Sequence, residues 1–306
     1  MSGATATPGI GRRLVIGHLF ADLLNLYGDR GNIATLSRRA QWRGITVEIR
    51  PIGQDDGDAL ADVDIAFIGG GQDAEQVAVA QGLQALGPAL VDAVRGGTAL
   101  LAVCGGYQNL GHAYRSELVG DLPGPGLLDA ETEAPRGAPR RVGGIVIQLE
   151  EGSPIAASGR ASAERAGHAG AETRLVGFEN HSGLTRLGAG ARPLGQALVG
   201  WGNNGDDGGE GLLAYPGEGD VAGVRIGTYL HGPLLPRNPH LGDYLIACAL
   251  GRTGQDPALE PIPDDAEWAA HTAVEARWRA EWERGRRLSR TRAGRLVERV
   301  QNLVGF

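Results

Sequence analysis

The sequence predicts an α/β fold, built on a mostly parallel sheet with helices on both faces and followed by a C-terminal helical extension. Three observations support this prediction. Apolar strand-like segments alternate with amphipathic segments over residues 13–112, as they do in βαβ units. From about residue 140 strand-like segments predominate. Beyond residue 264 a charged, tryptophan-containing segment has helical spacing.

Four apolar segments of the N-terminal half are predicted as strands, at residues 13–20, 45–52, 64–68 and 98–103. Two segments with helical spacing lie between them, at 32–44 and 75–97. Glycine clusters at 69–71 and 105–106 lie at the C-terminal ends of two of the strands. Ligands of such sheets bind beyond the C-terminal ends of the parallel strands, so we expect the functional site there.

The second half predicts strands within residues 140–149, 174–185, 197–205, 211–215 and 224–232. Residues 150–174 are small, polar and without periodicity, which predicts a mobile surface insertion. Residues 241–252 predict a closing helix, whose Cys248 we interpret as an inert core residue.

The bulk composition limits the class of protein. The chain has 306 residues, 42% of them hydrophobic, and a net charge of −7, which suits a globular protein with a substantial core. Its two cysteines suit a reducing compartment. Residues 1–12, expected to be flexible, lack the apolar core of a signal peptide, and no run of about 18 uncharged apolar residues occurs. We expect a cytoplasmic protein without a transmembrane span.

Residues 264–306 predict one basic helix, or two broken near Gly285, with Trp268, Trp278 and Trp282 at roughly helical spacing. The last 30 residues hold nine arginines and three glutamates, so an acidic body carries a basic tail. The acidic body argues against general nucleic-acid binding. Two interpretations of the extension remain open: an amphipathic helix packed on the body or exposed to solvent, and a helix that docks on a partner protein or an anionic membrane surface.

Cys104 stands at the end of a predicted strand, directly before Gly105 and Gly106. A strand that ends in a cysteine and turns through glycines into a helix predicts a nucleophile elbow. A helix N-terminus behind the sulfur would lower the pKa of the thiol. Amides of Gly105 and of the turn at 69–71 would stabilise an oxyanion. The alternative is a small apolar residue at the end of a core strand.

The elbow requires a base, and the chain has seven histidines. His231 directly follows a predicted strand and precedes Gly232 and Pro233, which places an imidazole at a strand end, where Cys104 also lies. We therefore favour His231 as the base and keep His181, in "GFENHSG", as the alternative. Structural roles are expected for the remaining histidines: His18, His112, His168, His240 and His271.

The segment "CGGYQ" at 104–108 resembles the Cys-x-Gly-x-Gln elbow of class I (triad-type) glutamine amidotransferases. The wider set resembles the cobyric-acid-synthase-like branch and, within it, the GatD-type glutaminase subunits of lipid II isoglutaminyl synthases. The matching segments, between about residues 14 and 250, are "DLLNLYGDRGNIATLSRRA", "FIGGGQDAEQ", "CGGYQNLG", "GFENHSG", "GWGNNGDDGGEG" and "GTYLHGPLLPRNP". The resemblance implies a three-layer class I amidotransferase-like fold over residues 13–252.

The resemblance also implies roles for individual residues. Cys104 would attack the side-chain amide of L-glutamine, and His231 would manage the proton. Residues matching the family's oxyanion region are Gly70, Gly71 and Gly105. Residues matching its glutamine contacts are Gln108 and Arg140; the alternative for Arg140 is a surface arginine beside Arg136 and Arg141.

The usual glutamate two residues after the histidine is replaced by Pro233, as expected for this branch. The group that orients His231 is therefore unassigned, and Asp29 and Glu179 are candidates. The resemblance implies a heterodimer with a Mur-ligase-like MurT subunit, which would bind ATP, Mg and lipid II. The segment "FIGGGQD" lacks the Gly-Lys-Ser/Thr ending of a phosphate loop. No metal or cofactor is expected in this chain.

The function that the resemblance implies is hydrolysis of glutamine to glutamate and ammonia, with the ammonia supplied to this partner for amidation of the D-glutamate α-carboxylate of lipid II to D-isoglutamine in peptidoglycan synthesis. Two other functions remain open: a glutaminase partner of another synthetase, as in corrinoid amidation, and a non-catalytic regulatory module.

Overall fold

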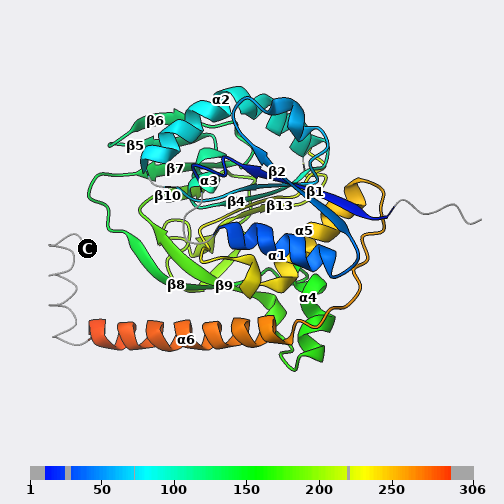
Figure 1. Ribbon diagram of the computed structural model, residues 1–306. Coiled ribbons are helices and arrows are strands. Elements are labelled where there is room, and N and C mark those ends of the chain that lie inside the picture. The colour runs from blue at the N-terminus through cyan, green and yellow to red at the C-terminus, as the bar shows by residue number, and fades with distance from the viewer. Residues whose placement is uncertain (1–10, 25–28, 72, 219–220, 291–306) are drawn as a thin grey trace, which may run out of the picture.

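The computed structural model describes residues 11–24, 29–71, 73–218 and 221–290 (Figure 1). Most of the predicted flexible N-terminus and the last part of the basic tail lie outside the described residues. The chain order begins β1 (Arg13–Leu19), α1 (Arg30–Gln41), β2 (Thr46–Ile52), β3 (Ile65–Ile68), α2 (Asp73–Arg95) and β4 (Ala99–Val103). This alternation confirms the prediction for the N-terminal half.

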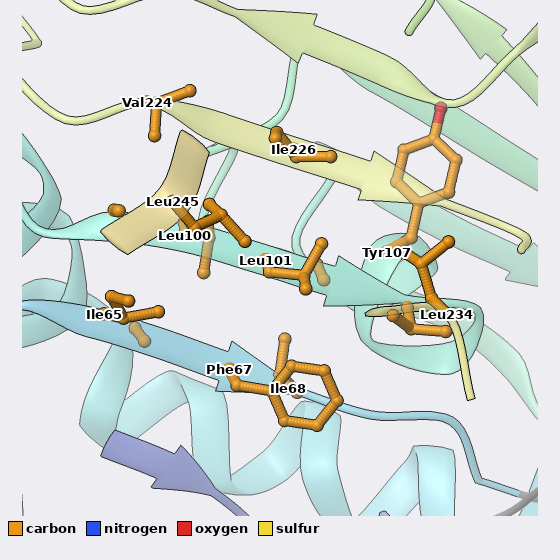
Figure 2. Packing of buried hydrophobic residues seen from close by; sticks show 14 of the residues in the cluster. Ile65, Phe67, Ile68, Leu100, Leu101, Tyr107, Val224, Ile226, Leu234 and Leu245 are labelled. Carbon is orange, nitrogen blue, oxygen red and sulfur yellow. The ribbon is translucent and has the colours of Figure 1, made fainter. Parts of the chain in front are cut away.

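A six-stranded sheet in the order β13-β14-β4-β3-β1-β2 forms the centre of the molecule. Its strands run parallel except β13 (Leu212–Ala214), which pairs antiparallel with β14 (Arg225–Thr228) at one edge. In register, Phe67 lies beside Leu101 and Leu101 beside Ile226. Figure 2 shows these side chains packed in one apolar layer, and burial on both faces explains the continuous apolar runs of β3 and β4.

Helices cover both faces of this sheet and complete three layers. α2 lies on one face, while α1 and α5 (Pro239–Arg252) lie together on the other (Figure 1). α2 is long and apolar enough to cross a membrane by length and composition, yet its Val79, Leu83 and Leu86 are buried in the core. α2 therefore packs as the core helix of a layered α/β domain.

Two four-stranded sheets account for the β-rich second half. One has the order β10-β7-β5-β6 and the other β12-β11-β8-β9. Their strands are β5 (Ala113–Ser116), β6 (Gly120–Pro123), β7 (Ala130–Ala134), β8 (Arg141–Gln148), β9 (Arg174–His181), β10 (Leu184–Leu187), β11 (Gly195–Val199) and β12 (Gly209–Glu210). Short 3₁₀ turns complete the described elements, at Gly57–Leu60, Ala171–Thr173 and Leu235–Arg237.

The structure differs from the expected mobile insertion at residues 150–174. Residues Pro154–Arg165 form α4, which packs against α5. The contact uses small residues: a methyl group on Gly159 would lie 2.5 Å from His240 Cβ and 3.1 Å from the Trp268 ring. Because alanine and glycine carry this interface, the apolar periodicity that identifies most helices is weak here.

The extension forms one helix within the described residues, α6 (Asp265–Arg290), which continues through Gly285. Figure 1 shows it along β8 and β9. Trp268 is fully buried, Trp278 packs with Val146, Val176 and Val199 of that sheet, and Trp282 meets the Trp201 ring edge-on at 5.3 Å. The interpretation as an amphipathic helix packed on the body is thus confirmed for these residues.

A buried arginine joins α6 to the two helices beneath it. Arg39 of α1 forms paired hydrogen bonds of 2.7 Å with Asp243 of α5, and a third of 3.0 Å with Asp264, the residue before α6. Burial alone would lower the pKa of this guanidinium, but the two carboxylates raise it. The start of α6 is therefore anchored by a buried ionic cluster as well as by apolar contact.

Candidate active site

Cys104 occupies a strained turn between β4 and α3 (Gly105–Asn109). Its backbone angles are φ 51° and ψ −107°, in the left-handed region that L-residues avoid. The Cys104 N–H donates to Thr228 O at 2.8 Å, and the Gly106 N–H donates to Gly69 O at 3.0 Å. This is the geometry of a nucleophile elbow, as predicted, although the helix behind the sulfur has only five residues.

The two glycine clusters meet at this turn. A methyl group on Gly106 would lie 2.8 Å from Ile68 O, and one on Gly105 would lie 3.1 Å from Gly71 N. Side chains at these positions would push the loop at 69–71 away from the elbow. Glycine therefore allows the two backbones to approach each other, and this approach brings the Gly71 amide next to Gly105.

His231 lies beside Cys104, although 127 positions separate them in the sequence. A methyl group on Gly70 would lie 3.0 Å from His231 Cε1 and 3.3 Å from Cys104 Cβ. His231 Cε1 and Cys104 Cβ are thus no farther apart than the sum of these two distances. The predicted pairing of a strand-end cysteine with a strand-end histidine is present in the structure.

Backbone hydrogen bonds hold His231 in this position. Its N–H donates to Phe178 O at 2.7 Å, and the Phe178 N–H donates to His231 O at 3.2 Å, so β9 fixes the residue on one side. Gly232, at φ 92°, then reverses the chain. Burial lowers the pKa of His231 to about 3, with a smaller contribution from His181. The imidazole is therefore neutral at neutral pH and able to accept a proton.

His181, the alternative base, lies near His231 and lowers its pKa. Its ring stacks on Tyr229 with the centroids 3.6 Å apart. Its Nδ1 lies 2.9 Å from Gly183 O, and its Nε2 lies 3.7 Å from Glu179 Oε2. Its Nδ1 thus donates to a carbonyl, and its ring face is covered by a tyrosine, so His181 supports the site around the cysteine–histidine pair.

The two acidic residues proposed to orient His231 are both fully buried, and both accept backbone N–H groups. Glu179 accepts from Trp201 N at 2.9 Å and from Gly202 N at 3.1 Å. Asp29 accepts from Gly70 N at 2.7 Å, and burial raises its pKa to about 7. Asp29 therefore holds the glycine turn beside Cys104 and His231, and Glu179 holds the turn at residues 201–202.

Gln108 and Arg140 lie in different environments. Gln108 is buried below the elbow, where its Nε2 donates to the Tyr229 hydroxyl at 3.0 Å. Arg140 is exposed at the start of β8, and its Nε donates to Asn180 Oδ1 at 3.0 Å. Arg140 is thus held by Asn180 yet exposed to solvent, whereas Gln108 is buried and its Oε1 has no hydrogen-bond partner among the described residues.

A buried polar network under the site was not predicted from the sequence. The Tyr229 hydroxyl lies 2.6 Å from Thr185 Oγ1, which lies 2.7 Å from Thr132 Oγ1. Glu210 accepts from Tyr229 N at 2.6 Å and from Thr228 Oγ1 at 3.0 Å, and burial raises its pKa to about 8. The only signal in the sequence was that Glu210 falls in "GWGNNGDDGGEG", one of the segments carrying the resemblance.

The assembled groups suit acyl transfer through a thioester. They comprise a cysteine on a strained turn, a neutral histidine beside it, and the amides of two glycine clusters. Within the ranges that the structure describes, His, Cys, Asp and Glu side chains form no group of three that could hold a metal ion.

Comparison with known proteins gives a consistent result. Residues 15–239 match the family model of the CobB/CobQ-like glutamine amidotransferase domain. Subunit GatD of the lipid II isoglutaminyl synthase (glutamine-hydrolyzing) of Staphylococcus aureus (strain N315) is 37% identical over 83% of this chain and 91% of its own. The GatD subunit of Streptococcus pneumoniae (strain ATCC BAA-255 / R6) is 34% identical over 82% and 87%, respectively.

More distant similarities extend beyond these two subunits. The cobyric acid synthase of Nocardia farcinica (strain IFM 10152) is 33% identical over 57% of this chain but only 29% of its own. A solved glutamine amidotransferase aligns with a TM-score of 0.44 and 15% identity, over 76% of this chain and 98% of that one.

Proposed function

The chain belongs to the CobB/CobQ-like glutamine amidotransferase family, and from this premise we propose that it is the glutaminase subunit of a lipid II isoglutaminyl synthase. The match to the two GatD subunits extends over most of both partners of each comparison. The match to the cobyric acid synthase covers less than a third of that protein. Coverage therefore favours lipid II amidation over corrinoid amidation.

The observation that carries the chemistry is the meeting of Cys104 and His231 at Gly70. His231 accepts the thiol proton, and the thiolate attacks the side-chain amide carbon of glutamine. The N–H groups of Gly71 and Gly105 stabilise the oxyanion of the tetrahedral intermediate. Collapse of this intermediate, with the proton returned from His231 to the nitrogen, releases ammonia and leaves a thioester on Cys104.

Hydrolysis then completes the cycle. His231 accepts a proton from water, the hydroxide attacks the thioester, and a second oxyanion forms in the same place. Cys104 leaves as a thiolate, is reprotonated from His231, and glutamate is released. Both steps begin with a proton accepted by His231, so both require the neutral imidazole that burial favours.

Arg140 and Gln108 have separate roles in this proposal. Arg140 is exposed at the rim, anchored by Asn180, where its guanidinium would bind the α-carboxylate of glutamine. Gln108 donates to Tyr229 within the buried network, and its Oε1 faces no hydrogen-bond donor among the described residues. That oxygen would accept a hydrogen bond from the substrate, while Gly70 forms the wall between the nucleophile and the base.

The released ammonia requires an acceptor on another subunit. We assign ATP and Mg to a Mur-ligase-like MurT subunit, which would activate the D-glutamate α-carboxylate of lipid II for amidation to D-isoglutamine. This chain would then form a heterodimer with that subunit in the cytoplasm. The near-complete alignment with relatives named as subunits supports this division.

Two measurements test the proposal. The tagged chain, isolated from its own host so that bound subunits are retained, should release glutamate from glutamine, and both Cys104→Ala and His231→Ala should abolish this release without loss of the fold. The same preparation, supplied with ATP, Mg and lipid II, should form D-isoglutamine. Glutamate release that persists in Cys104→Ala would refute the mechanism, and amidation of a corrinoid in place of lipid II would refute the assigned pathway.

A further inference from the structure

Asp29 occupies an N-cap position but does not cap its helix. It precedes α1, where an aspartate would ordinarily accept N–H groups of the first turn, yet its side chain makes no capping hydrogen bond. Its Oδ2 instead accepts the Gly70 N–H at 2.7 Å. The local sequence thus favours one partner for this carboxylate, and the folded chain gives it another, 41 positions away.

The surroundings of the Asp29 carboxylate are unfavourable for folding. Asp29 is fully buried, and its Oδ1 has no hydrogen-bond partner among the described residues. Burial of a carboxyl group that has no cation beside it and makes one hydrogen bond is unfavourable for folding. Asparagine would make the same hydrogen bond with no charge, so the clue to a role is the partner of this side chain, the amide of Gly70.

The position of Asp29 relative to the reacting groups suggests its role. A methyl group on Gly69 would lie 2.6 Å from Asp29 Oδ2, so the carboxylate presses against the turn at 69–71. Gly70 separates Cys104 from His231, and the N atom of Gly71 lies 3.1 Å from a methyl group built on Gly105. A hydrogen bond to the middle residue therefore fixes the orientation of both flanking peptides.

We propose that Asp29 is a positioning residue that holds the turn Gly69–Gly71 so that the Gly71 N–H points, with the Gly105 N–H, at the oxyanion of the reaction. This inference rests on the proposed glutaminase function. It differs from the earlier expectation that Asp29 orients His231, since the hydrogen bond goes to the amide of Gly70.

Two substitutions separate this role from helix capping. Asp29→Ser supplies a good N-cap, but its shorter side chain does not reach Gly70, so the anchor is lost while the start of α1 is retained. Asp29→Asn keeps an oxygen at the length needed to accept the Gly70 N–H. The matched control is Asp56→Ser, because Asp56 is exposed and its Oδ2 accepts the Gly53 N–H at 2.8 Å, an amide outside the turn at 69–71.

Glutamine hydrolysis by Asp29→Ser should show a kcat lower by about 10- to 100-fold, since loss of a whole oxyanion donor costs about 10²–10³ in kcat. KM should remain within about threefold, and Asp29→Asn should keep more than half of the wild-type kcat. Alkylation of Cys104 by iodoacetamide forms no oxyanion, so its rate should be equal in wild type and Asp29→Ser. Asp56→Ser should match wild type throughout.

Each other result would overturn the inference. Wild-type kcat in Asp29→Ser would show that the anchor is dispensable, and a parallel fall in the alkylation rate would place Asp29 on the cysteine–histidine pair. A loss in Asp29→Asn equal to that in Asp29→Ser would show that charge, not hydrogen-bond geometry, is needed. A wild-type chain with no glutamine hydrolysis would instead refute the proposed function itself, which keeps the two failures distinct.

Discussion

The strained backbone of Cys104 should make glycine more stable than alanine at this position. A residue at φ 51° and ψ −107° costs about 1–3 kcal/mol, and glycine adopts such angles without this cost. At an unstrained position, replacing alanine by glycine destabilises the folded protein in two ways. The greater conformational entropy of glycine in the unfolded chain contributes roughly 0.5–1 kcal/mol, and the loss of a buried methyl group contributes about 0.8 kcal/mol. Ala102, fully buried in β4, provides the measure of these two contributions.

The experiment compares four proteins by urea unfolding: wild type, Ala102→Gly, Cys104→Ala and Cys104→Gly. The effect of Ala102→Gly contains the entropy and burial contributions alone, whereas the step from Cys104→Ala to Cys104→Gly also contains the released strain. The two effects should differ by about 2 kcal/mol in favour of glycine at 104, which is roughly thirtyfold in the folding equilibrium. Equal effects at both positions would show that residue 104 is unstrained and would remove the elbow from the mechanism.

Three further predictions concern other parts of the structure. Burial lowers the pKa of His231 to about 3, so the neutral residue's contribution to stability is complete above about pH 6.5. Toward pH 3 this contribution is lost by about 1.4 kcal/mol per pH unit. The variant His231→Asn should therefore show a flatter dependence of the unfolding free energy on pH over that window, and an unchanged slope would contradict this. Arg140→Ala should raise the KM for glutamine about 10- to 100-fold, the equivalent of one charge-assisted hydrogen bond, with kcat within twofold; a fall in kcat alone would count against its binding role. Gly144→Ala would place a methyl group 2.0 Å from Trp278 Cδ2, whereas Gly143→Ala would place one 3.3 Å from the Trp201 ring. Only Gly144→Ala should therefore expose α6 to limited proteolysis. Equal protection of α6 in the two variants would argue against the packing described.

The sequence predicted the sheet because its strands follow a simple rule. β3 and β4 are apolar throughout, since both of their faces are buried, and a glycine cluster follows each strand, after Cys104 in the case of β4. The same rule brought Cys104 and His231 together, because parallel strands end at one edge of a sheet. The cysteine, the histidine and the glycine turn were therefore accessible from pattern and position alone.

Other features depend on contacts between distant parts of the chain. Nothing near Asp29 indicates that its side chain leaves the helix end for Gly70, because the amide that it accepts belongs to another element. Likewise, α4 is buried through Gly159 against His240 and Trp268, and these surfaces exist only after the chain has folded. Local propensity predicts helix caps and apolar faces, whereas the partner of Asp29 and the burial of α4 are decided by tertiary structure.

The position of α6 has a practical consequence for anyone who shortens this protein. The family match ends at residue 239, yet Trp278 and Trp282 shield Val146, Val176 and Val199. A chain trimmed to the family limit would lose α5 (Pro239–Arg252) from the face of the central sheet and would also leave Val146, Val176 and Val199 uncovered. Such apolar strips promote self-association. The added helix and the sheet face beneath it are thus interdependent: neither can be lost or made polar in evolution without a matching change in the other.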